Sequence, residues 1–253
     1  MKSDSDNNDK SSFTGLAAKL GRLPADKRRV ALEMSAALAA ISLKVSREFV
    51  EAVPRAAEIL SADDLRAWGE LGRRLAMGSA GTGASFFAGG VEDLVEVPED
   101  ARELVFQIAT RQLVLSSSTA LETLAFVPVL VREIDDDILF TEILKLALEI
   151  AGRSAKHSSD FLQKTPGLVA VLNALGTRKL DVAKPLLRLA SIFAGRTGGM
   201  TADLWSTLPS SLEGLSADDS IRLAERAAEF IDFGGSVTLH FITSGGAVLR
   251  NAP

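Results

Sequence analysis

The chain has 253 residues, 47% of them hydrophobic and 24% charged, which is ordinary for a folded protein with a sizeable core. Its net charge of −5 argues against a nucleic-acid partner, because affinity for the phosphate backbone rests on Lys and Arg. The lack of Cys excludes disulfides, thiolate nucleophiles and Cys-ligated metal sites, and it agrees with a cytoplasmic location.

The N-terminus, MKSDSDNNDKSS, is polar and lacks the apolar stretch of a secretory signal. We expect a disordered leader over residues 1–15 and a single helical-repeat domain over residues 16–253. The longest apolar runs, at residues 35–43 and 125–131, are far shorter than the roughly 20 residues that span a bilayer. The sequence therefore predicts no membrane span.

Most of the chain repeats Leu, Ala and Ile at intervals of three and four residues, as in LRAWGELGRRLA, which is typical of helices. A bulky anchor residue also recurs at intervals of 37, 37, 38, 43 and 36 residues, at Val50, Phe87, Leu124, Leu162, Trp205 and Phe241. Because self-similarity at this period is typical of stacked helical hairpins, we predict an all-α α-solenoid of about five to six hairpins of roughly 37 residues.

Each hairpin has a recurring pattern around its anchor. Its first helix is expected over residues such as 64–77, and its second helix over residues such as 79–89. Hydroxyl residues eight positions before four anchors are expected to cap the second helices, at Ser79, Ser116, Ser154 and Thr197. Small residues fifteen positions before the same anchors are expected where two helices approach closely, at Gly72, Ala109, Ala147 and Ala190. A proline four positions after an anchor is expected to mark the exit from the hairpin, at Pro54, Pro128, Pro166 and Pro209.

The glycine-rich stretch SAGTGASFFAGG, residues 79–90, invites comparison with a phosphate-binding loop. A P-loop needs Lys followed by Ser or Thr after its second glycine, and this stretch has neither. We interpret it as the second helix of one hairpin, with glycines at close helix contacts. Acidic runs at residues 61–65, 97–103, 133–137 and 216–221 fall where one hairpin passes to the next, which favours helix capping over cation binding.

Five residues are candidates for contact with a protein partner. Trp68 and Trp205 are aromatic, although core packing is the alternative that their helical spacing favours. The long interval of 43 residues predicts a linker from Asn173 to Pro185, which carries Arg178, Lys179 and Lys184. A merely solvated loop is the alternative there.

No catalytic, cofactor-binding or metal-binding residue is predicted. The two histidines, His157 and His240, lie 83 residues apart. We expect His157 to be solvated and His240 to be a partly buried, hydrogen-bonded residue. Because the sequence also lacks known nucleophile or metalloprotease motifs, we expect a protein that is not an enzyme.

The segment LRAWGELGRRLA, its Ser cap and the following FF resemble the helical repeats that accompany von Willebrand factor A domains in bacterial proteins of the nitric oxide reductase activation and Rubisco activation type. The resemblance covers roughly residues 30–250. It implies an adapter role beside a MoxR-type AAA+ ATPase or a von Willebrand factor A domain protein. The Asp-x-Ser-x-Ser metal-adhesion motif of that domain is missing, so its metal-dependent adhesion is not implied here.

These observations predict a helical scaffold that binds another protein. The alternative is a carrier of a small hydrophobic ligand or lipid, with an apolar cavity between the helix layers. The last unit, from Phe230 onward, is apolar, and it lacks the polar outer face that the end of a solenoid needs. We therefore expect this end to pack on something, for example a second copy in a homo-oligomer. The segment SVTLHFIT in this unit has a strand-like composition, but the register predicts a helix.

Overall fold

The computed structural model describes residues 18, 20–89, 91–196 and 198–251. Over these residues it contains twelve α-helices, three short 3₁₀ turns and no strand, so the all-α prediction is confirmed. The contacts divide the chain into two compact units, Met1–Phe106 and Gln107–Pro253, with the boundary inside helix α6 (Glu99–Leu115). The expected disordered leader lies outside the described residues.

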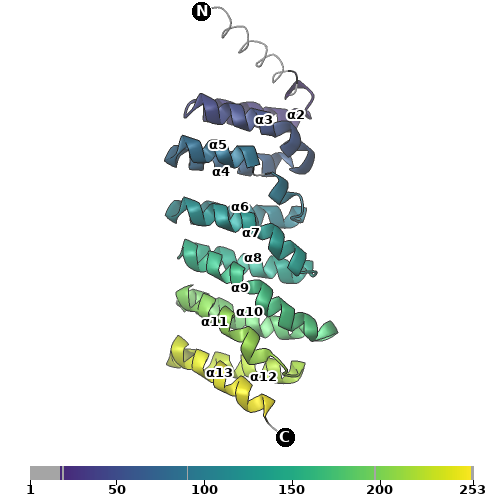
Figure 1. Ribbon diagram of the computed structural model, residues 1–253, viewed down its shortest axis with the longest axis vertical. Coiled ribbons are helices and arrows are strands. Elements are labelled where there is room, and N and C mark those ends of the chain that lie inside the picture. The colour runs from purple at the N-terminus through teal and green to yellow at the C-terminus, as the bar shows by residue number, and fades with distance from the viewer. Residues whose placement is uncertain (1–17, 19, 90, 197, 252–253) are drawn as a thin grey trace, which may run out of the picture. The chain divides into compact units, whose positions relative to one another are not determined.

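The first unit contains two stacked helical hairpins. They are formed by α2 (Ala25–Ala39) with α3 (Leu43–Ile59) and by α4 (Ala62–Gly78) with α5 (Ala80–Gly89), and a 3₁₀ turn, η1 (Glu92–Leu94), precedes α6. Helix α4 packs on α2 and α5 packs on α3, so the first helices form one layer and the second helices another (Figure 1). Residues 80–89 of the glycine-rich stretch form α5, as the register predicts.

An aromatic cluster fills the core of the first unit. The ring centroid of Phe87 lies 4.8 Å from that of Trp68 and 5.1 Å from that of Phe49, each pair in an edge-on arrangement. Gly72 lies directly under Phe87, because a Cβ placed on this glycine would be 2.0 Å from Cζ of the ring. The expected close approach at Gly72 therefore accommodates the anchor of the following helix.

The second unit continues the two-layer arrangement. Its helices are α7 (Ser117–Glu133), α8 (Asp137–Ala151), α9 (Ala155–Ala174), α10 (Lys179–Arg196), α11 (Gly198–Leu212), α12 (Ala217–Glu229) and α13 (Gly235–Arg250), with the 3₁₀ turns η2 (Gly176–Arg178) and η3 (Ile231–Phe233). Helices α8, α10 and α12 contact one another in this order, and so do α7, α9, α11 and α13 (Figure 1). Within each unit the contacts thus follow the order of stacked hairpins; a solenoid over the whole chain stays a prediction.

In two hairpins, a serine of the second helix donates a hydrogen bond to the backbone of the first helix at a small residue. Ser158 Oγ donates a hydrogen bond to the backbone oxygen of Ala147 at 2.8 Å. In the first unit, Ser46 Oγ donates to the oxygen of Ser35 at 2.9 Å. Both acceptors lie fifteen positions before the anchor and both donors lie four positions before it. The sequence register therefore corresponds to a repeated hydrogen bond.

Most of the expected helix caps are present. The side chains of Ser79, Ser116 and Ser154 each accept a hydrogen bond at 3.3 Å from the backbone N–H three residues later. Ser42 occupies the same position before α3 but makes no side-chain cap bond, and Thr197 lies outside the described residues. The hydroxyl pattern therefore marks the start of three second helices.

The acidic runs also begin helices. Ser61 and Asp64 form a reciprocal capping box at α4, and Ser216 accepts a hydrogen bond from the backbone N–H of Asp219 at 3.1 Å. Asp136 caps α8 by accepting from the N–H of Leu139 at 2.9 Å. The capping interpretation of these three runs is confirmed.

Arginines join successive hairpins in the second unit. Arg153 and Arg196 both lie nine positions before an anchor, and each donates to a backbone oxygen near the end of the next hairpin's first helix, those of Gly195 and Ile231. Arg196 also pairs with Asp232 at 2.6 Å. A cation beside the C-terminal carbonyls of a helix is favoured by their unpaired lone pairs and by the helix dipole.

Two of our predictions about the ends of elements are wrong. Pro54, Pro128, Pro166 and Pro209 lie inside α3, α7, α9 and α11 and do not mark an exit. The helices continue past these prolines because their apolar stripes continue, as Val127 and Leu130 show on either side of Pro128. The segment 173–185 is not a linker: the additional residues lengthen α9 and α10, and the connection is η2, in which Gly176 adopts a φ of +60°.

The last hairpin differs from the prediction by one residue. SVTLHFIT is helical, as expected, but Ile242 is fully buried while Phe241 is half-buried, so Ile242 is the anchor. The spacing from Trp205 then becomes 37 residues, and Gly234 takes the N-cap position eight residues before the anchor. The expectation of an apolar outer face from Phe230 onward agrees with the exposed side chains of Phe233, Val237 and Val248.

Candidate functional site

The two tryptophans are part of the core. The side chain of Trp68 is 0% exposed and that of Trp205 is 1% exposed. Trp205 packs on Phe161 with ring centroids 4.8 Å apart, and its indole N–H donates to Oγ1 of Thr165 at 3.0 Å. The expectation that Trp68 and Trp205 contact a partner is therefore corrected, because neither offers surface to bind.

Arg178 and Lys179 are engaged in ion pairs within the second unit. Arg178 donates to Asp218 at 3.0 Å and to Asp181 at 2.8 Å, and these bonds, chiefly the one to Asp218, raise the pKa of its guanidinium. Lys179 donates to Asp135, which lowers the pKa of that carboxyl. Arg178 thus ties η2 to α12, and Lys179 ties the start of α10 to Asp135, which leaves both cations less suited to partner contact than Lys184.

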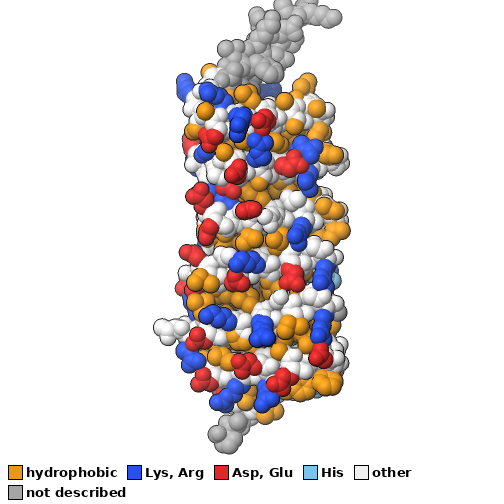
Figure 2. All heavy atoms as spheres, turned by 180° about the vertical axis from the view of Figure 1, so that it is seen from behind, with side chains coloured by type: hydrophobic (Ala, Val, Ile, Leu, Met, Phe, Trp, Pro, Cys, Tyr) orange, Lys and Arg blue, Asp and Glu red, His pale blue; other side chains and the backbone are white. Residues whose placement is uncertain are grey.

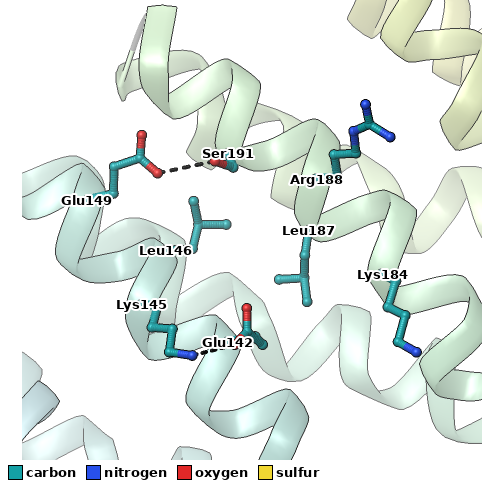
Figure 3. A pocket seen from close by; sticks show the side chains of 8 residues that line it. All are labelled: Glu142, Lys145, Leu146, Glu149, Lys184, Leu187, Arg188 and Ser191. Carbon is teal, nitrogen blue, oxygen red and sulfur yellow. Dashed lines mark hydrogen bonds and ion pairs between the residues drawn. The ribbon is translucent and has the colours of Figure 1, made fainter.

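Lys184 lies at the edge of a groove between α8 and α10 in the second unit. The groove has a volume of about 320 Å³, and Leu146 of α8 and Leu187 of α10 form its apolar floor (Figure 3). Glu142, Lys145 and Glu149 line the α8 side, and Lys184, Arg188 and Ser191 line the α10 side. Both walls are thus rows of polar side chains one helical turn apart.

The polar groups of the two walls differ in how they are paired. Lys145 donates to Glu142 at 2.7 Å, and Ser191 Oγ donates to Glu149 at 3.3 Å across the groove (Figure 3). Lys184 and Arg188 lie four residues apart on α10, are exposed, and have no hydrogen-bond or ion-pair partner within the described part of the chain. The groove therefore offers two unpaired cations beside an apolar floor.

Charge is otherwise mixed over the surface of each unit. The rear view shows Lys and Arg side chains interspersed with Asp and Glu, and hydrophobic side chains lie between them (Figure 2). Many of the charges are paired within one helix, as are Arg47 with Glu51 and Arg55 with Glu58. Two adjacent cations without an acidic partner thus set the α8–α10 groove apart from the surface around these pairs.

The two histidines differ in exposure. His240 is exposed, which corrects the expectation of a partly buried residue, and its Nε2 lies 3.5 Å from Oγ of Ser244. His157 is half-buried on α9. Among the described residues, no group of three or more His, Asp or Glu side chains is arranged to hold a metal ion.

Sequence reasoning identified Lys184 but missed the rest of the groove. The sequence analysis did not identify Arg188, Leu187 or the α8 residues. It treated the segment around Lys184 as a linker and therefore did not consider which helix face Lys184 shares. The spacing of Lys184 and Arg188 by four residues was the signal for a common helix face. Their position across the groove from the α8 residues depends on the packing of α8 on α10, which no local pattern reveals.

The described helices do not combine the length and apolarity that a bilayer crossing needs. An apolar cavity for a carrier function is not supported by the groove, whose walls are charged, and that alternative stays a prediction. Comparison of the chain with protein-family models, with curated proteins and with solved structures found no match.

Proposed function

We propose that the chain is a non-enzymatic scaffold that binds another protein through the α8–α10 groove. The single observation that supports this proposal is the pair of unpaired cations, Lys184 and Arg188, next to the apolar floor formed by Leu146 and Leu187. A partner segment with an apolar side chain flanked by carboxylates fits this chemistry. The apolar contact supplies affinity, and the charges select the partner and its orientation.

The class of partner follows from the resemblance of the repeats. An adapter role beside a MoxR-type AAA+ ATPase, or beside a von Willebrand factor A domain protein, is the setting that we propose. A groove of about 320 Å³ is at the small end of ligand pockets, which agrees with the insertion of a side chain from a larger partner.

The test uses a photo-crosslinking amino acid at Leu187 in the full chain, with a second chain carrying it at the exposed Leu43 as reference. We expect one protein to crosslink at residue 187 and not at residue 43. The purified partner should then bind the unsubstituted chain with an affinity that falls as the salt concentration rises. Equal crosslinking at both positions would contradict the proposal.

A charge reversal makes the test specific to the groove. Lys184→Glu together with Arg188→Glu is expected to weaken partner binding at least about tenfold, because like charges then face the partner's carboxylates. The matched control is Lys156→Glu with Lys164→Glu, which makes the same change of charge at exposed positions of α9. Calorimetry of both variants decides the question, and equal affinities would exclude the groove as the binding site.

A further inference from the structure

Within the described residues, the α12–α13 hairpin is hollowed at register positions that are buried in the α10–α11 hairpin. Helices α12 and α13 pack on α10 and α11, in which Leu189, Leu208 and Leu212 are buried. The residues 37 positions later are Arg226, Gly245 and Leu249. These three line a hollow of about 870 Å³ on the α12–α13 hairpin. The hollow is thus at the place where a further helical layer packs in the preceding step.

The floor of this hollow is apolar. Phe241 and Leu249 are half-buried there, and Val248 is 68% exposed. Leu223 of α12 lies beneath them, with its Cδ1 close to Gly245. An exposed valine beside a half-buried phenylalanine and leucine supplies the apolar area that an association needs.

The rim of the hollow has a charge order that is complementary to itself. Along α12 the lining residues Arg222, Glu225, Arg226 and Glu229 alternate in charge. We align a second α12 antiparallel to the first, with the two-fold axis between residues 225 and 226. In this alignment Arg222 faces Glu229 of the partner subunit. In the same alignment Arg226 faces Glu225 of the partner subunit. Each of these four lining residues then faces an opposite charge on the copy.

We propose that two copies of the chain form a dimer through the α12–α13 face, with the two α12 helices antiparallel about a two-fold axis. A two-fold contact requires one surface to be complementary to itself, and the charge order on α12 meets this requirement. The apolar floor supplies the affinity, and the charges fix the antiparallel orientation. This surface lies on α12 and α13, whereas the proposed partner groove lies on α8 and α10.

The existing ion pairs of α12 permit this exchange of partners. Arg226 pairs with Glu229 at 3.1 Å, and Arg222 lies 3.7 Å from Asp219. The side chains of Arg226, Glu229 and Arg222 are largely exposed, and that of Asp219 is about one third exposed. Exposed ion pairs within a helix contribute little to stability. Re-pairing across the two-fold axis therefore costs little in the free chain.

The test is a set of charge reversals measured by analytical ultracentrifugation of the full chain. We expect the unsubstituted chain to dimerise as its concentration rises. Arg226→Glu places two carboxylates at each of two symmetric contacts, and Glu225→Arg places two cations there. Each single variant is expected to raise the dissociation constant of the dimer at least about tenfold. The matched control is Arg55→Glu, which breaks a similar pair with Glu58 in the first unit and should leave the dimer unchanged.

Mixing the two variants tests the orientation. A chain with Arg226→Glu and a chain with Glu225→Arg have complementary charges in the antiparallel alignment. Their mixture is therefore expected to form a heterodimer at concentrations where each variant alone associates weakly. A variant that fails to fold would not be rescued by mixing, and circular dichroism of each variant checks its helix content. An unsubstituted chain that stays monomeric, or a mixture that does not associate, would overturn the proposal and would leave the α8–α10 groove untouched.

Discussion

Gly72 shows how one small residue determines the packing of a hairpin. The ring of Phe87 occupies the space that a side chain at position 72 would need, and Phe49, Trp68 and Phe86 surround that ring. Because the ring is enclosed on several sides, it has little freedom to move away. The anchor at Phe87 and the glycine fifteen positions before it therefore act as a pair.

We expect Gly72→Ala to destabilise the protein by about 1–3 kcal/mol, because the added methyl group overpacks the core. In a chain that also carries Phe87→Leu, the same change should cost less, since the smaller side chain makes room. Gly69→Ala is the matched control, because the nearest atoms to its Cβ belong to the flexible side chain of Met34 at 3.0 Å. Urea unfolding of the unsubstituted chain, of each single variant and of the double variant measures the coupling between positions 72 and 87. Additive effects of the two changes would contradict this account.

At the scale of the helix, capping decides where elements begin. Ser42 and Ser61 both stand at the N-cap position of a helix, yet only Ser61, which is followed three residues later by Asp64, takes part in a capping box. A side chain that accepts a backbone N–H satisfies a group that the helix leaves without a partner. The contribution of each serine to stability therefore differs although their positions are alike.

We expect Ser61→Ala to lower the free energy of unfolding by about 1 kcal/mol, the usual loss for an N-cap. Ser42→Ala serves as its control, because Ser42 makes no side-chain cap bond, and it should change stability by less than about 0.5 kcal/mol. Chemical denaturation followed by circular dichroism measures both changes. Equal losses at the two positions would show that the capping box contributes nothing specific.

At the scale of the molecule, hairpins depend chiefly on their neighbours. The helices of the second unit contact their own hairpin and the next one, and two compact units divide the chain at α6. In such arrangements stability is close to a sum of local terms and nearest-neighbour terms. A destabilising substitution in the core of one hairpin should therefore lower stability chiefly in that hairpin and in the hairpins that contact it.

We expect Trp205→Ala to speed amide hydrogen exchange in α9 and α11, where its ring packs, and to leave α3, α4 and α5 unchanged. Phe87→Ala should have the reverse effect, because its ring lies in the core of the first unit. Hydrogen exchange followed by mass spectrometry resolves both regions in one experiment. A uniform loss of protection over the chain would mean that the two units unfold together.

The amino-acid sequence by itself predicted the all-α class, the hairpin register and several residues that carry it. The anchors Phe87 and Trp205, the caps at Ser79 and Ser154, and the small residue Gly72 all have the roles that their spacing indicates. These features were predictable because helical periodicity and capping act over three to fifteen residues along the chain.

Only the tertiary structure decided where helices end and which surfaces stay open. Pro128 lies within a helix because buried neighbours on both sides outweigh its missing N–H, and a local pattern shows only the proline. The groove beside Lys184 and the charged face of α12 depend on residues from separate helices or on the packing of a neighbouring hairpin. Burial depends on which helices meet in space, so the sequence register alone did not reveal these two surfaces.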